Sequence, residues 1–353
     1  MKRDLKFMEE ILTAKSPSSV ENEGIKVWDN FMSGLHGFTR TYEDNMKNSG
    51  WSIGHGSEKV LLSGHVDEIA LSVISIDSDG FITLASMAGA DKKCLPGSKL
   101  LVLADSGEWI PGIIHKAPLH IEHVEKTIDK VCNYKELKLD VGASSKEEVE
   151  NMGIFPGSPV VFDRNIILEF GENKVVGNAL DDKAAIYVIS QVAAYLSELD
   201  VDNPIFYKYK FIFLAGTQEE TGCRGLTVAS KNINPDISID LDVTFACDGG
   251  LVTSGSAGGE VYLGKGPVIE FGPDKNREIA LELVNLAKEK EIPYQRAFSR
   301  NGGTDTDTIQ LSSKNCKTVL LSIPNMSMHT QNETCDWRDL GACVDLIISY
   351  FTK

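Results

Sequence analysis

Histidine and acidic side chains stand directly after three apolar, strand-like runs of the sequence. His65 and Asp67 follow the first run, Glu219 and Glu220 follow the second, and Asp242 follows the third. Imidazole nitrogens combined with carboxylate oxygens suit zinc, cobalt or manganese better than magnesium, which rarely binds histidine. The residue types and their positions therefore predict a site for a divalent metal of this kind.

Two further segments add to this set. Asp181 and Asp182 open a predicted helix at 181–197, and His329 comes after the apolar run at 318–323. Taken alone, the aspartate pair is expected to cap the helix, and His329 is expected to be an ordinary loop histidine. Their joint occurrence favours a shared site, because ligands gather beyond the carboxyl ends of the strands in a helix-covered sheet.

The spacing within the pairs gives each member a separate role. Positions i and i+2 of an extended chain point to the same side, so Asp67 is placed to hold the second ring nitrogen of His65. The alternative is a chance surface pair. Glu219 and Glu220 would usually be a solvated charged pair, but directly after an apolar strand an acid or base beside a metal ligand is favoured.

Other reactive side chains give weaker signals. Cys223 could be a nucleophile, but no His-x-Asp partner adjoins it, so a packed thiol is predicted. His115, His120 and His123 lie close together without strand-end carboxylates, and a structural or surface role is predicted for them. The Gly-rich stretches lack the pattern of a phosphate-binding loop.

Alternating strands and helices must position these residues. The first helix is predicted from Leu5 to Leu12, and the last covers 340–351. Strand patterns follow at 59–64, Lys208–Gly216, Ile237–Phe245 and Thr318–Ile323, with the helix at 181–197 between them. This order predicts an α/β fold with a mostly parallel or mixed sheet sandwiched by helices.

The segment 72–168 has a different sequence pattern, in which Gly-rich turns separate short β-branched strands. It predicts a small β-rich domain inserted into an α/β domain formed by 1–71 and 169–353. A chain of 353 residues is long enough for two such domains.

The composition excludes several kinds of partner. The chain has 51 acidic and 35 basic residues and a formal net charge of -16, which disfavours nucleic acid and anionic membrane surfaces. The N-terminus is too charged for a secretory signal, and no apolar run is long enough to span a bilayer. The seven cysteines form no C-x-x-C motif. A reduced, cytoplasmic protein is predicted.

The order of the motifs resembles that of the M42 family of dinuclear metalloaminopeptidases, the glutamyl/leucyl and tetrahedral aminopeptidase group, whose members are sometimes labelled endoglucanase. The resemblance covers nearly the whole chain and rests on GHVDE at 64–68, ALDDKAA at 179–185, QEETGCRG at 218–225, DVTFACD at 242–248, GGTD at 302–305 and a His-x-x-x-Glu at 329–333. It implies a zinc-peptidase-like catalytic domain, and it implies that the β-rich insertion is a dimerisation domain.

The resemblance also implies a role for each site residue. Asp181 would bridge two metals, with His65 and Asp242 completing one and Glu220 and His329 the other. The general base would be Glu219, and Asp67 would hold the ring of His65. Asp248 is the alternative to Asp242. A cis peptide is expected between Asp181 and Asp182.

The implied activity is removal of N-terminal residues from peptides by a water activated by two divalent metals. Zinc is expected, with cobalt or manganese as alternatives. The implied partners are peptides with a free N-terminus and further copies of the chain, from a dimer up to a dodecamer. The alternatives are a two-metal carboxypeptidase or N-acyl amino acid deacylase, a glycoside hydrolase using Glu219 and Glu220, and a non-catalytic assembly protein. The sequence departs from the family at Thr221, Cys223 and 325–330. These departures are expected to change substrate specificity rather than catalysis.

Overall fold

The computed structural model describes residues 2–125, 131–298 and 303–353, and these form two compact units. The first unit contains Met1–Glu68, Ile166–Met328 and Asn332–Lys353, and the second contains Ile69–Asn165 and His329–Gln331. The limits expected from the sequence, 72 and 168, each differ from these by three residues. The structure also groups the short segment at 329–331 with the second unit.

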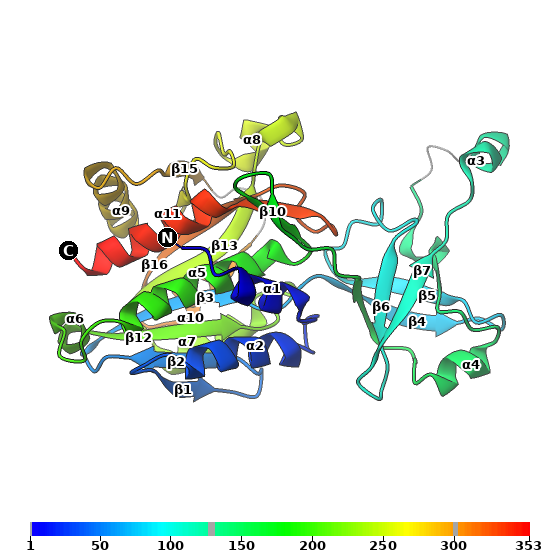
Figure 1. The fold of residues 1–353 in the computed structure, drawn as a ribbon, viewed down its shortest axis with the longest axis horizontal. Coiled ribbons are helices and arrows are strands. Elements are labelled where there is room, and N and C mark those ends of the chain that lie inside the picture. The colour runs from blue at the N-terminus through cyan, green and yellow to red at the C-terminus, as the bar shows by residue number, and fades with distance from the viewer. Residues whose placement is uncertain (1, 126–130, 299–302) are drawn as a thin grey trace. The chain divides into compact units, whose positions relative to one another are not determined.

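An eight-stranded mixed sheet forms the centre of the first unit (Figure 1). Its strands in spatial order are β1 (Thr39–Glu43), β2 (Ser49–Ile53), β12 (Tyr209–Gly216), β3 (Glu58–His65), β13 (Ile237–Phe245), β16 (Lys317–Asn325), β14 (Val268–Phe271) and β15 (Gln295–Phe298). The four central strands β12, β3, β13 and β16 run parallel to one another. Their carboxyl ends therefore meet at one edge of the sheet, where ligands are expected.

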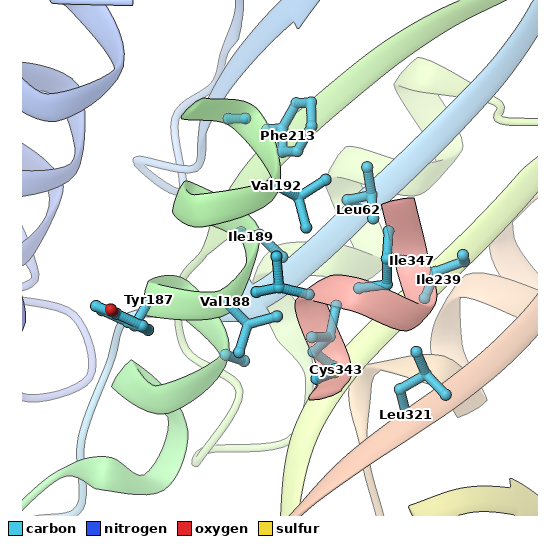
Figure 2. Packing of buried hydrophobic residues seen from close by; sticks show 14 of the residues in the cluster. Leu62, Tyr187, Val188, Ile189, Val192, Phe213, Ile239, Leu321, Cys343 and Ile347 are labelled. Atoms are coloured by element: carbon cyan, nitrogen blue, oxygen red, sulfur yellow. The ribbon is translucent and has the colours of Figure 1, made fainter. Parts of the chain in front are cut away.

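Helices cover both faces of this sheet. On one face lie α1 (Leu5–Thr13), α2 (Asn22–Ser33), α5 (Leu180–Ser197), α9 (Arg277–Glu289) and α11 (Trp337–Phe351), and on the other lie α7 (Arg224–Ile233) and α10 (Asp305–Ser312). Side chains alternate along each strand, so Leu62 and Phe213 pack against α5 (Figure 2), whereas Leu61 and Leu214 pack against α7. The predicted α/β fold, with a mixed sheet between helices, is confirmed.

Smaller elements complete the first unit. A three-stranded antiparallel sheet contains β10 (Ile167–Phe170), β11 (Lys174–Gly177) and β17 (Glu333–Asp336). The short helices are α6 (Pro204–Lys208), α8 (Ser254–Ala257) and a 3-10 turn at Asp248–Gly250. In the part of the chain that the structure describes, no helix is both long and apolar enough to cross a bilayer.

The second unit is a closed barrel. Its strands, in order around the barrel, are β4 (Ala70–Ile76), β5 (Ile82–Ala88), β8 (Lys138–Asp140), β7 (Trp109–Ile114), β6 (Lys99–Leu103) and β9 (Pro159–Phe162). The helices α3 (Leu119–Glu125) and α4 (Lys146–Asn151) and a 3-10 turn at Tyr134–Glu136 connect its strands. A separate apolar core that includes Leu84, Val102 and Val160 fills the unit. The expected small β-rich unit is thus present.

Candidate metal centre

His65 is the last residue of β3, beside Gly216 of the parallel strand β12, and its side chain is buried. Its Nδ1 lies 3.1 Å from the backbone oxygen of Asp67 and 3.4 Å from Asp67 Oδ1. Both are acceptors, so Nδ1 carries a hydrogen and donates it. The other nitrogen, Nε2, lies 3.2 Å from Asp181 Oδ1 and is the ring atom that faces the carboxylates.

The Asp181–Asp182 pair does not cap a helix, so that part of the sequence-based interpretation is wrong. The N-cap of α5 is Ala179, and both aspartates have non-helical backbone angles. The peptide bond between them is cis, as the family resemblance implies. The two carboxylates instead surround His65: Asp181 contacts its ring, and Asp182 Oδ2 accepts its backbone N–H at 3.2 Å.

Two contacts fix the backbone and side chain of this pair. The N–H of Asp181 donates to Glu333 Oε2 at 2.7 Å, and Glu333 is the glutamate of the His-x-x-x-Glu motif. Asp182 is fully buried, and its Oδ1 has no hydrogen-bond partner among the described residues. A buried carboxylate oxygen without a donor is a costly arrangement in a folded protein, and a bound cation would satisfy it.

The segment after β12 places Glu219 and Glu220 beside Asp67. The N–H groups of Glu219 and Glu220 donate to Asp67 Oδ1 at 3.0 Å and Oδ2 at 3.2 Å. The hydroxyl of Ser18 donates to Asp67 Oδ2 at 2.7 Å. Asp67 therefore orients the glutamate pair through its backbone as well as holding the ring of His65.

The same segment is held from its other side by Asn48. Its Oδ1 accepts the N–H of Thr217 at 3.0 Å, and its Nδ2 donates to the backbone oxygen of Gly225. Gly225 lies so close to the strand end that an added Cβ would come 2.1 Å from the oxygen of Thr217. Gln218, immediately before the glutamates, has a left-handed φ of 57°. The tight turn presents both carboxylates toward His65.

Among the residues that the structure describes, two groups of side chains have the geometry to hold a metal ion. In each, the candidate ligand atoms lie within 4.8 Å of one another: His65, Asp181 and Glu220 form one group, and His65, Asp182 and Asp242 form the other. Both combine an imidazole nitrogen with carboxylate oxygens, the donor set of zinc and similar divalent ions. Together with the partnerless oxygen of Asp182, this donor set fits a bound metal.

The electrostatics of the site agree with that fit. Burial, followed by the charge of Asp242, raises the pKa of Asp182 well above its usual value. Burial, followed by the charge of Asp181, raises the pKa values of Glu220 and Asp242 well above theirs. Burial alone would lower the pKa of His65, but its hydrogen bonds to Asp181 and Asp67 raise it. These carboxylates are thus crowded in a water-poor environment, where a divalent cation would compensate their charges.

Glu219 is close to both groups and belongs to neither. Its Oε2 lies 3.8 Å from His65 Nε2, and its Oε1 accepts a hydrogen bond from the thiol of Cys223 at 3.2 Å. Burial raises the pKa of Glu219, and the charges of Asp181 and Asp67 raise it further, against the opposing effect of His65. A carboxylate with a raised pKa that is not required as a ligand has the properties of a general base.

His329, the fifth ligand implied by the resemblance, lies in the segment that the structure groups with the second unit. Within that unit its ring is packed against Gly89, where an added Cβ would come 2.4 Å from His329 Nδ1. Among the described residues, neither metal-capable group includes His329. Its place as a ligand stays a prediction.

The remaining sequence candidates lie elsewhere. Asp248 is in a 3-10 turn and accepts the N–H of Leu263 at 2.9 Å, outside both groups. His115 pairs with Asp140 at 3.0 Å on the barrel surface, and His120 is exposed in α3. The side chain of His123 lies outside the described residues.

Several polar residues around the centre could not be assigned from the sequence. Asp240, two residues before Asp242 on the same strand, accepts hydroxyl groups from Ser63 at 2.7 Å and Thr306 at 2.8 Å. The i, i+2 spacing of the two aspartates was the available signal. No spacing pattern indicates their partners, because these come from β3 and α10.

Lys183 is a second such residue, fully buried two positions after Asp181. Its Nζ donates to the backbone oxygen of Ala14 at 2.6 Å and lies 3.4 Å from Glu68 Oε1. Glu68 Oε1 also accepts the N–H of Ser16 at 2.7 Å. These contacts join the start of α5 and the end of the His65–Glu68 segment to the chain that follows α1.

Comparison with known proteins identifies the family of this chain. The family model of the M42 glutamyl aminopeptidases matches residues 50–346, most of the chain. The chain belongs to the M42 peptidase family. Lysyl aminopeptidase of Pyrococcus furiosus is 34% identical to this M42 peptidase over 292 residues, which are 82% of this chain and 80% of that protein.

Solved structures agree with this membership. The aminopeptidase APDkam598 of the archaeon Desulfurococcus kamchatkensis has a TM-score of 0.87 and 29% identity, covering 98% of this chain and 94% of that one. The TET1 peptidase of Pyrococcus horikoshii has a TM-score of 0.84 and 25% identity, covering 98% of each chain. The family resemblance read from the motifs is confirmed, and this M42 peptidase is a hydrolase of the aminopeptidase type.

Proposed function

We propose that this protein removes N-terminal residues from peptides, using two divalent metal ions and Glu219 as the general base. The observation that supports this most strongly is the position of Glu219. Its Oε2 lies 3.8 Å from Nε2 of His65, the residue that both metal-capable groups share, while Glu219 itself is in neither group. A base beside, but outside, a ligand set is the arrangement that water activation requires.

The proposed ligands are those implied by the family resemblance: His65, Asp181, Glu220, Asp242 and His329. Asp182 is an additional candidate, because the structure brings it together with His65 and Asp242. When bound, the metal ions would lower the pKa of the attacking water and stabilise negative charge on the peptide carbonyl. Zinc suits this nitrogen and oxygen donor set, as do cobalt and manganese.

Glu219 would move a proton twice in each turnover. Its carboxylate removes a proton from water as the water oxygen bonds to the carbonyl carbon of the peptide. The resulting carboxylic acid then gives that proton to the leaving nitrogen as the carbon–nitrogen bond breaks, which restores the carboxylate. The raised pKa of Glu219 supports both steps, because a carboxyl with a pKa closer to neutrality accepts and returns a proton more readily.

A preference for a free N-terminus is proposed from the family, whose model is that of the glutamyl aminopeptidases. One of the bound metal ions would also offer a position for the free α-amino group of the substrate. A peptide with a blocked N-terminus lacks that group. The substrates of a carboxypeptidase or an N-acyl amino acid deacylase need no free α-amino group next to the bond that is cleaved, so this requirement separates the classes.

Assembly and location are further parts of the proposal. The Pyrococcus horikoshii TET1 peptidase can assemble into a tetrahedron or a large octahedral shell. We propose that this chain also forms a homo-oligomer, with the barrel unit as its dimerisation domain, and that it acts in the cytoplasm.

The test is an assay of the metal-reconstituted protein on a panel of aminoacyl-anilides, with N-acetylated anilides, N-acyl amino acids and a glycoside substrate beside them. We expect hydrolysis of free aminoacyl-anilides only, lost on chelation and restored by zinc, cobalt or manganese. Hydrolysis of the N-acyl amino acids, or activity that survives complete metal removal, would refute the proposal.

A further inference from the structure

The thiol of Cys223 contacts the proposed general base directly. Its Sγ lies 3.2 Å from Glu219 Oε1. A carboxylate oxygen accepts hydrogen bonds and a thiol donates one, so the direction of this bond is fixed by the chemistry of the two groups. The contact links Glu219, inside the segment that connects β12 to α7, with Cys223, the last residue of that segment.

This bond distinguishes the two oxygens of Glu219. Oε1 is occupied by the thiol, whereas Oε2 lies 3.8 Å from His65 Nε2, on the side of the metal-capable groups. A carboxylate that can rotate about its last bond presents either oxygen to a water molecule. A hydrogen bond to one oxygen limits that rotation and keeps the other oxygen directed to the reacting water.

The backbone at Cys223 is an unusual place for a thiol. The residue has φ of 54° and ψ of 35°, in the left-handed region that a side chain disfavours by about 1–2 kcal/mol. It also occupies the N-cap of α7, where serine, threonine, aspartate or asparagine usually accepts a backbone N–H, but it makes no such bond. Its side chain is directed to Glu219 instead.

The thiol keeps its hydrogen in this position. Burial, followed by the negative charges of Asp305 and Glu219, raises the pKa of Cys223 well above its usual value. A group that remains protonated is a persistent donor and a poor nucleophile. This agrees with the contact geometry and opposes the nucleophilic role that the sequence left as an alternative for Cys223.

We propose that Cys223 is a positioning residue for catalysis: its thiol anchors Oε1 of Glu219 so that Oε2 takes the proton from the attacking water. The proposal rests on the proposed function, in which Glu219 is the base. It assigns a role to a position at which this chain departs from the more apolar residues of its family.

The experiment compares Cys223→Ala with Cys223→Ser in the metal-reconstituted enzyme. The two variants differ by one oxygen, so their difference isolates the donor from the change in volume. We expect Cys223→Ala to lower kcat on the order of fivefold, the scale of one hydrogen bond, with little change in KM. Cys223→Ser keeps a donor and should recover most of that loss. The metal content of both should equal that of the wild type.

A control variant separates this contact from the rest of the turn. Thr227 is exposed, and its hydroxyl donates to the backbone oxygen of Cys223 at 2.7 Å without touching Glu219. Thr227→Val removes that bond and perturbs the same turn. Its kcat should remain close to that of the wild type.

A double-mutant cycle with Glu219→Gln completes the test. In the wild-type background, Cys223→Ala should lower kcat by the full amount given above. In the Glu219→Gln background, the same substitution should hardly lower kcat, because the carboxylate to be positioned is gone. An equal loss in both backgrounds, or equal kcat for the alanine and serine variants, would overturn the role of Cys223. A failure of the proposed function is distinguishable, since the wild type would then lack aminopeptidase activity or Glu219→Gln would retain it.

Discussion

Asp67 Oδ1 accepts the backbone N–H of Glu219 at 3.0 Å, across a separation of 152 residues in the sequence. The same carboxyl group accepts the N–H of Glu220 and lies 3.4 Å from Nδ1 of His65. One side chain therefore sets the orientation of an imidazole and of two neighbouring carboxylates. A change at Asp67 affects the proposed base and two proposed ligands at once.

Replacing Asp67 by asparagine is expected to lower activity or metal affinity by about 10–100-fold, the usual effect of removing a partner that orients metal ligands. The amide keeps one acceptor, but its NH2 group faces a backbone N–H or the protonated Nδ1 of His65. The effect is measured as turnover and metal content, after circular dichroism has shown that the variant is folded like the wild type. Ser18→Ala is the control, because it removes only the hydroxyl donor and leaves both amide bonds. Normal metal content with normal turnover in Asp67→Asn would disprove this orienting role.

Glu219→Gln should retain metal and lose at least about 100-fold in kcat, the scale of general-base catalysis. Glutamine has the shape of glutamate but cannot take a proton from water. The neighbouring variant Glu220→Gln is the matched comparison, and it should lose metal affinity because Glu220 is a proposed ligand. Turnover and metal content, measured together, separate the two roles. If Glu219→Gln turned over at a near-normal rate, another residue would have to be the base.

Metal removal should destabilise the folded protein as well as inactivate it. Without cations, the buried carboxylates of Asp181, Asp182 and Asp242 repel one another. An ion that binds only the folded state stabilises it by about 2.7 kcal/mol when its free concentration is 100 times its Kd. Thermal unfolding of chelated and reconstituted protein should therefore give a higher Tm with metal. The shift should be much smaller in Glu220→Gln, and identical Tm values for the chelated and reconstituted wild type would contradict this expectation.

Asp339 should make the stability of the protein depend on pH. It is fully buried in α11, and its oxygens accept the N–H groups of Gly264 and Gly266, each at 2.7 Å. Burial raises its pKa from 3.8 to about 7, against the opposing effect of these two bonds. Between those pH values the folded protein keeps a proton that the unfolded chain releases, so stability falls as the pH rises. The contribution is at most about 1.4 kcal/mol per pH unit in that window.

Urea unfolding at several pH values between 5 and 8 measures this contribution. Asp339→Asn cannot lose a proton, so its free energy of unfolding should fall less steeply with pH than that of the wild type. The comparison uses the slope, because the amide also loses one acceptor for the glycine N–H groups. Asp345→Asn, an exposed position on the same helix, should keep the wild-type slope. Parallel curves for Asp339→Asn and the wild type would show that Asp339 does not cause the pH dependence.

The sequence predicted the parts of the site that depend on local pattern. The apolar runs before His65 and Glu219 are buried strands, and parallel neighbours bring their ends together, so these residues could be placed at one edge of the sheet. The role of Asp181 and Asp182 as helix caps was wrong, because a single chain segment gives no sign that its carboxylates will face an imidazole from another strand. The contacts of Asp67 with the glutamate backbone and of Lys183 with Ala14 are likewise tertiary. They depend on how segments far apart in the chain pack together, which no spacing pattern records.

Ala179, Gln218 and Cys223 are non-glycine residues with left-handed backbone angles, and they lie within a few residues of the proposed ligands and base. Each such position costs folding free energy that glycine would save. Selection of variants for heat resistance alone should therefore favour glycine there, and Cys223→Gly would be found at the expense of the contact with Glu219. Thermostability and turnover compete at these positions, so an engineer seeking a more robust enzyme should leave the turn after β12 unchanged and stabilise the protein elsewhere.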